Sequence, residues 1–189
     1  TTEIEALFSK IEWRKADITD VPAMIPVFEG VSHVYHCAAL ISFDSADYRE
    51  MRKVNIHGTA IMANLAIDAD VEKLCYVSSI ATIGKPVKDN ESITEDTHWN
   101  PEDDNSAYAI TKYGAEMEVW RGTQEGLDAV IVNPGVIIGA GIWRYGSGSI
   151  FKKVYKGLKY YTSGNVGLVS AKYGQSHVFQ FYFHQRKIT

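Results

Sequence analysis

A tyrosine, a lysine and a serine in this sequence have the types and spacing of an acid–base catalyst. Tyr108 and Lys112 are four residues apart, so on a helix their side chains lie on one face and meet. A phenol ionises at a pKa of about 10, and a neighbouring ammonium favours its phenolate form near neutral pH. Ser79 closes an apolar run at 74–79, and its hydroxyl can hydrogen-bond a substrate oxygen as charge develops there. Together the three residues predict proton and hydride transfer at a carbon–oxygen bond.

A second tyrosine and lysine have the same spacing, at Tyr155 and Lys159. The surrounding sequence separates the two pairs. Tyr108 lies between a strand-like apolar run that ends at Ser79 and a second apolar strand that follows its helix. Tyr155 has no such neighbours, so we interpret that pair as an exposed helical pair.

Predicted strands and helices alternate along the chain and position these residues. The hydrophobic pattern predicts strands over 11–16, 31–37, 72–78 and 128–133, with helices near 21–29, 46–69 and 106–124 between them. This alternation predicts a parallel sheet. Right-handed crossovers then bring the carboxyl ends of the strands, with Ala38, Ser79 and Pro134, to one edge where ligands bind.

Three short motifs follow one another in a familiar order: Val77-Ser78-Ser79, then Tyr108 to Lys112, then Val132-Asn133-Pro134-Gly135. In these motifs the sequence resembles the extended short-chain dehydrogenase/reductases of the NAD-dependent epimerase/dehydratase superfamily. Within that superfamily it most resembles the dihydroflavonol reductase and 3β-hydroxysteroid dehydrogenase-like branch, over most of residues 7–163. The resemblance implies an α/β fold with a Rossmann-type doubly wound parallel sheet. It also implies that Ser79, Tyr108 and Lys112 are the catalytic residues.

The same resemblance implies NADP or NAD as the cofactor and no metal. It implies cofactor contacts at the ends of the strands, in the small-residue turn after the fourth family strand, and on the catalytic helix. The implied set is Asp17, Ile18, Cys37, Ala38, Ala39, Asn55, Val77, Ser78, Tyr108, Lys112, Pro134, Gly135 and Val136. The choice between NAD and NADP stays open, because it is usually set at the end of the second strand, which has no counterpart here.

The sequence departs from the family pattern at both ends. We find no strand, glycine-rich turn and helix that would bring a pyrophosphate to a helix N-terminus. We therefore expect residues 1–164 to form an incomplete dinucleotide-binding domain and residues 165–189 to be fragments of a C-terminal substrate-binding region. A sheet without its first βαβ unit would have exposed strand edges and uncovered apolar faces.

Composition limits the other classes of protein. The 189 residues are 46% hydrophobic with a net charge of −4, which favours one domain with a core and argues against nucleic-acid binding. No apolar run approaches the ~20 residues that span a bilayer, so we expect no membrane partner. Cys37 and Cys75 lie in apolar runs, which predicts buried, reduced thiols and a cytoplasmic protein.

Three functions remain open. The first is an oxidoreductase that interconverts a carbonyl and a secondary alcohol on a small, hydrophobic substrate, with Tyr108 as general acid or base, Lys112 lowering its pKa, and Ser79 orienting the oxygen. Asn133 favours this reading, because many nucleotide-sugar enzymes of the superfamily have Arg there. The alternatives are a nucleotide-sugar epimerase or dehydratase with tightly bound NAD, and a non-catalytic dinucleotide sensor. The resemblance also implies a homodimer through the helix of Tyr108.

Overall fold

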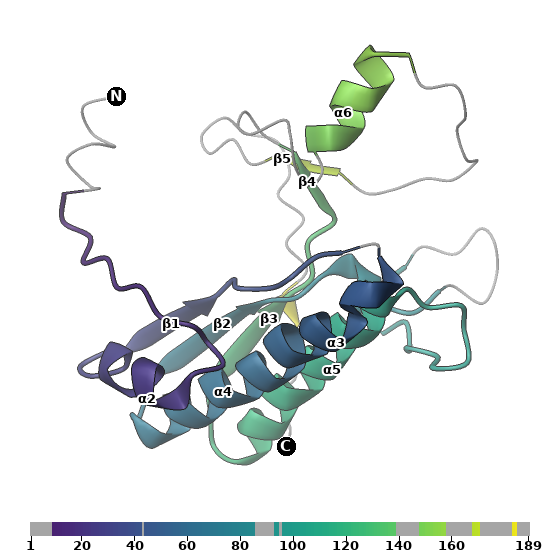
Figure 1. Ribbon diagram of the computed structural model, residues 1–189. Helices are drawn as coiled ribbons and strands as arrows, with labels where there is room; N and C mark the ends of the chain where they lie inside the picture. The colour runs from purple at the N-terminus through teal and green to yellow at the C-terminus, as the bar shows by residue number, and fades with distance from the viewer. Residues whose placement is uncertain are drawn as a thin grey trace.

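A parallel β-sheet forms the centre of the described structure (Figure 1). The computed structural model describes residues 9–42, 44–85, 93–94, 96–138, 148–157, 168–170 and 183–184. Strands β1 (His33–His36), β2 (Lys73–Val77) and β3 (Ala129–Val132) pair in parallel, and β6 (Phe183–His184) pairs antiparallel with β3. A separate pair joins β4 (Val136–Ile138) to β5 (Leu168–Ser170), also in parallel. The predicted strands at 31–37, 72–78 and 128–133 and their parallel order are confirmed.

The predicted helices are confirmed at 21–29, 46–69 and 106–124. The first is the short α2 (Val21–Met24) with a 3-10 turn, η1 (Ile25–Val27). The second is built from η2 (Ser45–Asp47), α3 (Tyr48–Met51), the π-helical η3 (Arg52–His57) and α4 (Gly58–Asp68). The third is α5 (Ala107–Gln124), and two further pieces are η4 (Ile80–Thr82) and α6 (Gly148–Tyr155). Among the described residues, no helix is long and apolar enough to cross a membrane.

Helices α3 and α4 continue one another through η3, and this helical stretch lies beside α5 over one face of the sheet (Figure 1). Side chains alternate between the two faces of a strand, and Leu74 and Tyr76 of β2 are buried in the core under these helices. The helices meet them with fully buried small or branched residues, such as Ala63, Ala115 and Val119. Burial of one large aliphatic side chain contributes about 1.5–3 kcal/mol, so this layer holds α5 firmly against the strand ends.

Local sequence signals fix where α5 begins and ends. The Ser106 hydroxyl accepts a hydrogen bond from the Ala109 backbone N–H at 3.1 Å, which caps the first turn. After Gln124, Gly126 adopts a φ of +106°, in the region that favours glycine, and the chain turns toward β3. Tyr108 therefore lies in the first turn of a helix whose start is set by a cap.

The face of the sheet away from the helices is open. Tyr35 of β1 is 75% exposed. The predicted strand at 11–16 is wrong: these residues form no strand, and Trp13 is 69% exposed. A strand needs a neighbour for its backbone groups, and the family resemblance places two strands between this segment and β1 that have no counterpart in the sequence.

The prediction of buried thiols also fails in part. Both cysteines are free, as expected, but Cys37 is exposed and Cys75 is half-buried. The alternation along β1 that points Tyr35 to the open face continues to Cys37. An apolar run predicts burial only where both faces of the strand are covered.

Candidate active site

The carboxyl ends of β2 and β3 are joined by backbone hydrogen bonds. The Ser78 N–H donates to the Val132 carbonyl at 2.8 Å, and the Ile80 N–H donates to the Pro134 carbonyl at 3.0 Å. These bonds hold Ser79 beside Pro134. The structure thus brings together two of the three strand ends that the sequence predicted to meet.

Tyr108 approaches the same edge from the first turn of α5. Burial raises its pKa above the usual value for a tyrosine, and a side-chain hydrogen bond with Ser79 lowers the pKa in part. The net shift raises the pKa of Tyr108, opposite to the lowering that the sequence predicted from Lys112, and it keeps the phenol protonated at neutral pH. The side chains of Ser79 and Tyr108, the two hydroxyl-bearing members of the predicted catalytic set, therefore interact at this edge.

Lys112 is buried beneath this contact and is only 1% exposed. Its Nζ donates to the phenolic oxygen of Tyr76 at 2.6 Å and to the Val77 carbonyl at 2.9 Å. Burial lowers the pKa of Lys112 to about 8, while the charges of Glu116 and Cys37 raise it. Among the described residues these two acceptors take two of the three ammonium hydrogens, which leaves the third for a ligand.

Sequence reasoning missed Tyr76, the nearest partner of Lys112. Its ring lies 4.3 Å from Nζ, and burial raises the pKa of its phenol far above the usual value. Tyr76 hydrogen-bonds the Thr59 side chain, and the Thr59 hydroxyl lies 2.9 Å from Nε2 of His36. A buried polar chain thus leads from Lys112 to His36. The only sequence signal for Tyr76 was its alternate position in a buried strand.

The buried His36 makes the stability of the fold depend on pH. Burial, with the nearby Lys112, lowers the pKa of His36 from 6.5 to about 4, so the unfolded chain binds a proton more readily. The contribution of His36 to the free energy of unfolding is therefore fully present above pH 6.5. It is lost as the pH drops toward and below 4, by about 3 kcal/mol in total. Urea unfolding at several pH values should show this slope in the wild type and its loss in His36→Gln. The exposed His33 is the control, and an equal effect of His33→Gln would contradict the assignment.

Asn55 holds the turn after β1 against α5. Its Oδ1 accepts from the Leu40 N–H at 2.7 Å, and its Nδ2 donates to the Leu40 carbonyl and to the Thr111 hydroxyl, both at 3.0 Å. Asn55 lies within the π-helical η3, where the sequence predicted a regular helix, and such π segments are frequent at functional sites. Its printed hydrogen bonds join the Leu40 backbone to Thr111 of α5, and its predicted contact with the cofactor stays a prediction.

Other predicted cofactor residues also lie at this edge. Ala38 and Ala39 are exposed after β1, Val77, Gly135 and Val136 are half-buried, and Pro134 is buried. The turn after β1 and the ends of β2 and β3 therefore offer small or apolar groups and backbone to a ligand.

The remaining pair, Asp17 and Ile18, lies in the chain before α2. The Asp17 carboxylate accepts from the Thr19 N–H at 2.9 Å and from the Thr19 hydroxyl at 2.8 Å, and these bonds lower its pKa. Ile18 packs on Gly58 so closely that a Cβ there would lie 2.6 Å from Ile18 Cδ1. The exposed Asp17 carboxylate is thus held in place by Thr19, while Ile18 packs the segment against α4.

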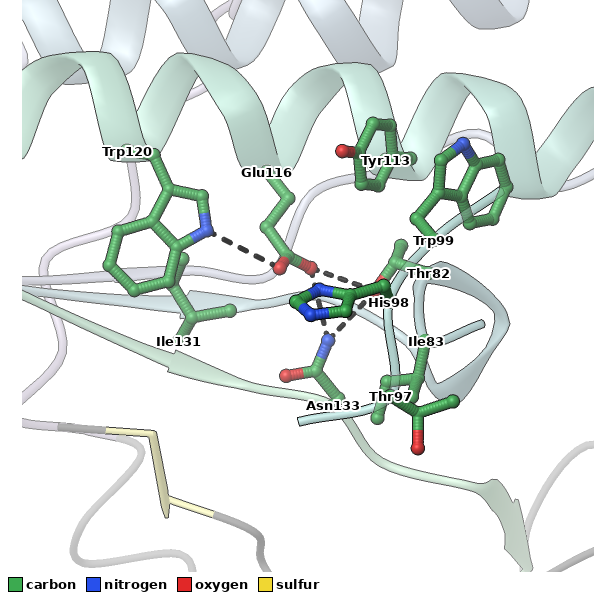
Figure 2. A pocket seen from close by; sticks show the side chains of 10 residues that line it. All are labelled: Thr82, Ile83, Thr97, His98, Trp99, Tyr113, Glu116, Trp120, Ile131 and Asn133. Atoms are coloured by element: carbon green, nitrogen blue, oxygen red, sulfur yellow. Dashed lines mark hydrogen bonds between the residues drawn. The ribbon is translucent and has the colours of Figure 1, made fainter. Parts of the chain in front are cut away.

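Ser78 has a different environment from the rest of the predicted set. It is buried, and its hydroxyl donates to Oε2 of Glu116 at 2.7 Å. Thr82 and Asn133 also bond this carboxylate, and with Glu116 they line a cavity of about 150 Å³ beneath α5 (Figure 2). Sequence reasoning did not identify Glu116, although it lies one helical turn beyond Lys112.

Comparisons with known proteins agree with this geometry. The NAD-binding family model described as "Male sterility protein" matches residues 22–177. A putative dihydroflavonol 4-reductase of Synechocystis is 33% identical over 130 residues, which cover 68% of this chain and 37% of the relative. A 3β-hydroxysteroid dehydrogenase/Δ5→4-isomerase of Mycobacterium tuberculosis is 28% identical over 178 residues, which cover 89% of this chain and 46% of the relative.

Solved structures give the same result. A short-chain dehydrogenase/reductase superfamily protein from Agrobacterium tumefaciens, crystallised with bound NAD, matches with a TM-score of 0.60 and 28% identity over 66% of this chain and 38% of that protein. The structural matches confirm the predicted Rossmann-type fold, and the bound NAD agrees with the expected cofactor. This chain spans less than half the length of the curated relatives that it matches.

Proposed function

Because this chain belongs to the extended short-chain dehydrogenase/reductases of the NAD-dependent epimerase/dehydratase superfamily, we propose that it interconverts a carbonyl and a secondary alcohol with NAD or NADP. The observation that carries the proposal is that Ser79 and Tyr108 interact at the ends of the strands, where the ammonium of Lys112 is buried against the Val77 carbonyl. Among the described residues, no group of three or more His, Cys, Asp or Glu side chains could hold a metal ion.

The residues at the strand ends fit the nicotinamide half of such a cofactor. Lys112 has a third ammonium hydrogen for a ribose hydroxyl, and the exposed Ala38 and Ala39 allow a ligand to approach the backbone closely. Pro134 and Gly135 offer an apolar wall on the other side. A glycine-rich turn for the pyrophosphate is not found in the sequence, so we assign these residues contacts to the nicotinamide end only.

When bound, the cofactor supplies or accepts the hydride, and the protein supplies position and electrostatics. In reduction, the Tyr108 phenol gives its proton to the substrate oxygen as negative charge develops there. The Ser79 hydroxyl donates a hydrogen bond to the same oxygen and fixes its place. Lys112 stabilises the phenolate that remains, and Tyr108 acts as the base when the reaction runs in reverse. Burial keeps the pKa of Tyr108 above its usual value, so the phenol holds the proton that reduction requires at neutral pH.

The substrate class follows from two supporting observations. The relatives named above are a putative dihydroflavonol 4-reductase and a 3β-hydroxysteroid dehydrogenase, and both names specify a substrate built on carbon rings. Asn133 before Pro134 supports the same branch. We therefore propose a hydrophobic aldehyde or ketone as the substrate, in a cytoplasmic enzyme.

A homodimer through α5 is also part of the proposal. Ile110 and Met117 are seven residues apart on this helix and are 40% and 38% exposed, so they form an apolar stripe that a second copy can cover. Sedimentation equilibrium should give twice the mass of one chain. A single-chain mass at micromolar concentration would contradict the dimer.

The proposed reaction is tested by incubating the purified protein with NADH or NADPH and a panel of apolar aldehydes and ketones. We expect loss of nicotinamide absorbance, with one alcohol formed per cofactor oxidised. A parallel panel of nucleotide sugars tests the epimerase or dehydratase alternative, which converts sugar without net cofactor consumption and retains NAD through purification. Cofactor binding without turnover in either panel would favour the non-catalytic sensor.

A further inference from the structure

A carboxylate that sequence reasoning overlooked gathers three buried donors next to the proposed catalytic residues. Oε2 of Glu116 accepts from the Ser78 hydroxyl at 2.7 Å, from the Thr82 hydroxyl at 2.8 Å and from Nδ2 of Asn133 at 3.0 Å. Figure 2 shows the carboxylate pointing from α5 toward Thr82 and Asn133. Hydrogen bonds to an ionised acceptor are about twice as strong as neutral ones, so this cluster ties α5 to the strand ends.

Each of the three donors adjoins a residue of the proposed site. Ser78 precedes Ser79 in the chain, and Asn133 precedes Pro134. The Thr82 hydroxyl also lies 2.9 Å from the Ser79 carbonyl, and Nδ2 of Asn133 lies 3.3 Å from that carbonyl. The position of Ser79 therefore depends on a network whose centre is Glu116.

The Glu116 carboxylate also acts on Lys112, which lies four residues earlier on the same helix. Residues four apart on a helix are neighbours, and the negative charge of Glu116 raises the pKa of Lys112 against the effect of burial. The titratable groups that interact with Lys112 from the surrounding elements are Glu116 on α5, Tyr76 on β2, His36 on β1 and Cys37 after β1.

We propose that Glu116 is a positioning residue of the active site, which fixes Ser79 through Ser78, Thr82 and Asn133 and holds a carboxylate one helical turn from Lys112. This inference rests on the proposed function, since it assigns Glu116 a task for the Ser79, Tyr108 and Lys112 set. Glu116 acts through these residues and not on the substrate itself.

Glu116→Gln separates this role from simple packing. Glutamine has the same shape and still offers one oxygen acceptor, so the fold is kept while the negative charge is lost. Without that charge the pKa of Lys112 falls, by about one unit, and the loss of activity at high pH begins about one pH unit lower. We also expect kcat to fall about tenfold with a smaller change in the KM of the cofactor. The matched control is Glu118→Gln on the same helix, because the Glu118 carboxylate accepts from Arg121 and not from the site. This variant should leave the dependence of activity on pH unchanged.

Thr82→Val tests the geometric half of the proposal without changing any charge. It removes the hydroxyl that lies within hydrogen-bond distance of both the Glu116 carboxylate and the Ser79 carbonyl, and it keeps a similar volume. We expect a kcat about tenfold lower, while the pH at which activity begins to fall at high pH stays as in wild type. Wild-type kcat in this variant would overturn the positioning of Ser79.

A direct titration of Lys112 makes the test independent of turnover. With ¹³Cε-labelled lysine, the NMR signal of Lys112 reports its pKa in wild type, Glu116→Gln and Glu118→Gln. A pKa lowered in Glu116→Gln alone supports the inference, and equal values in all three proteins overturn it. Wild-type protein with no carbonyl or alcohol turnover would refute the proposed function instead, while this titration would still decide the effect of Glu116 on Lys112.

Discussion

Tyr108→Phe should reduce kcat for carbonyl reduction by about 10³-fold, within the range of 10² to 10⁴ that general acid–base catalysis contributes. The substitution removes one oxygen and leaves the ring, which is partly buried in the first turn of α5. Cofactor affinity and thermal stability should change little, because the contacts that hold α5 are made by other residues. Steady-state kinetics with the substrate found in the carbonyl panel, combined with thermal unfolding, measures both effects.

The chain provides its own control for this experiment in the second tyrosine with a lysine four residues later. Tyr155 is 93% exposed and has no contact with the strand ends in the described structure. Tyr155→Phe should therefore retain wild-type kcat. A Tyr108→Phe protein that keeps more than a tenth of the activity would exclude Tyr108 as the proton donor.

Lys112→Met should produce the second large effect, a loss of kcat/KM of at least about 10²-fold, which corresponds to about 2.7 kcal/mol of transition-state stabilisation. Methionine is unbranched and fits the narrow space along α5, but it has no charge to stabilise the Tyr108 phenolate and no hydrogen for a ribose. Fluorescence titration with the reduced cofactor should show about tenfold weaker binding.

The stability of Lys112→Met distinguishes a catalytic role from a structural one. An ammonium that is 1% exposed is costly to bury, and replacing a buried charge by an apolar side chain is often neutral. Tyr76 keeps its hydrogen bond to Thr59 in this variant. We therefore expect a melting temperature within a few degrees of wild type. Full activity together with a large loss of stability would show that Lys112 only supports the fold.

The elements that the sequence predicted well have local causes. Helix α5 has a serine cap, a run without proline and a glycine after its end, all within about twenty residues, and its predicted span of 106–124 agrees with Ala107–Gln124. The three central strands are apolar runs between turn signals. The Ser79 to Pro134 adjacency followed from the general rule that parallel strands end at one edge.

The features that were missed depend on residues far apart in the sequence. The segment 11–16 has a strand pattern but no strand beside it, and Cys37 lies in an apolar run whose other face is uncovered. Lys112 meets Tyr76 across 36 positions, and Glu116 meets Thr82 across 34. Such contacts need the register between a helix and a sheet, which hydrophobic periodicity does not supply. The catalytic and cofactor-contact roles of the predicted residues themselves stay predictions.

Transfer of deuterium tests the central claim most directly. The protein is given the reduced cofactor labelled with deuterium at nicotinamide C4, together with a carbonyl substrate from the panel, and the alcohol is analysed by mass spectrometry and NMR. We predict one deuterium on the carbinol carbon with wild-type protein and with Tyr155→Phe, and almost none in the same time with Tyr108→Phe. Alcohol formed without deuterium at that carbon, or formed at equal rates by wild type and Tyr108→Phe, would contradict hydride transfer assisted by Ser79, Tyr108 and Lys112.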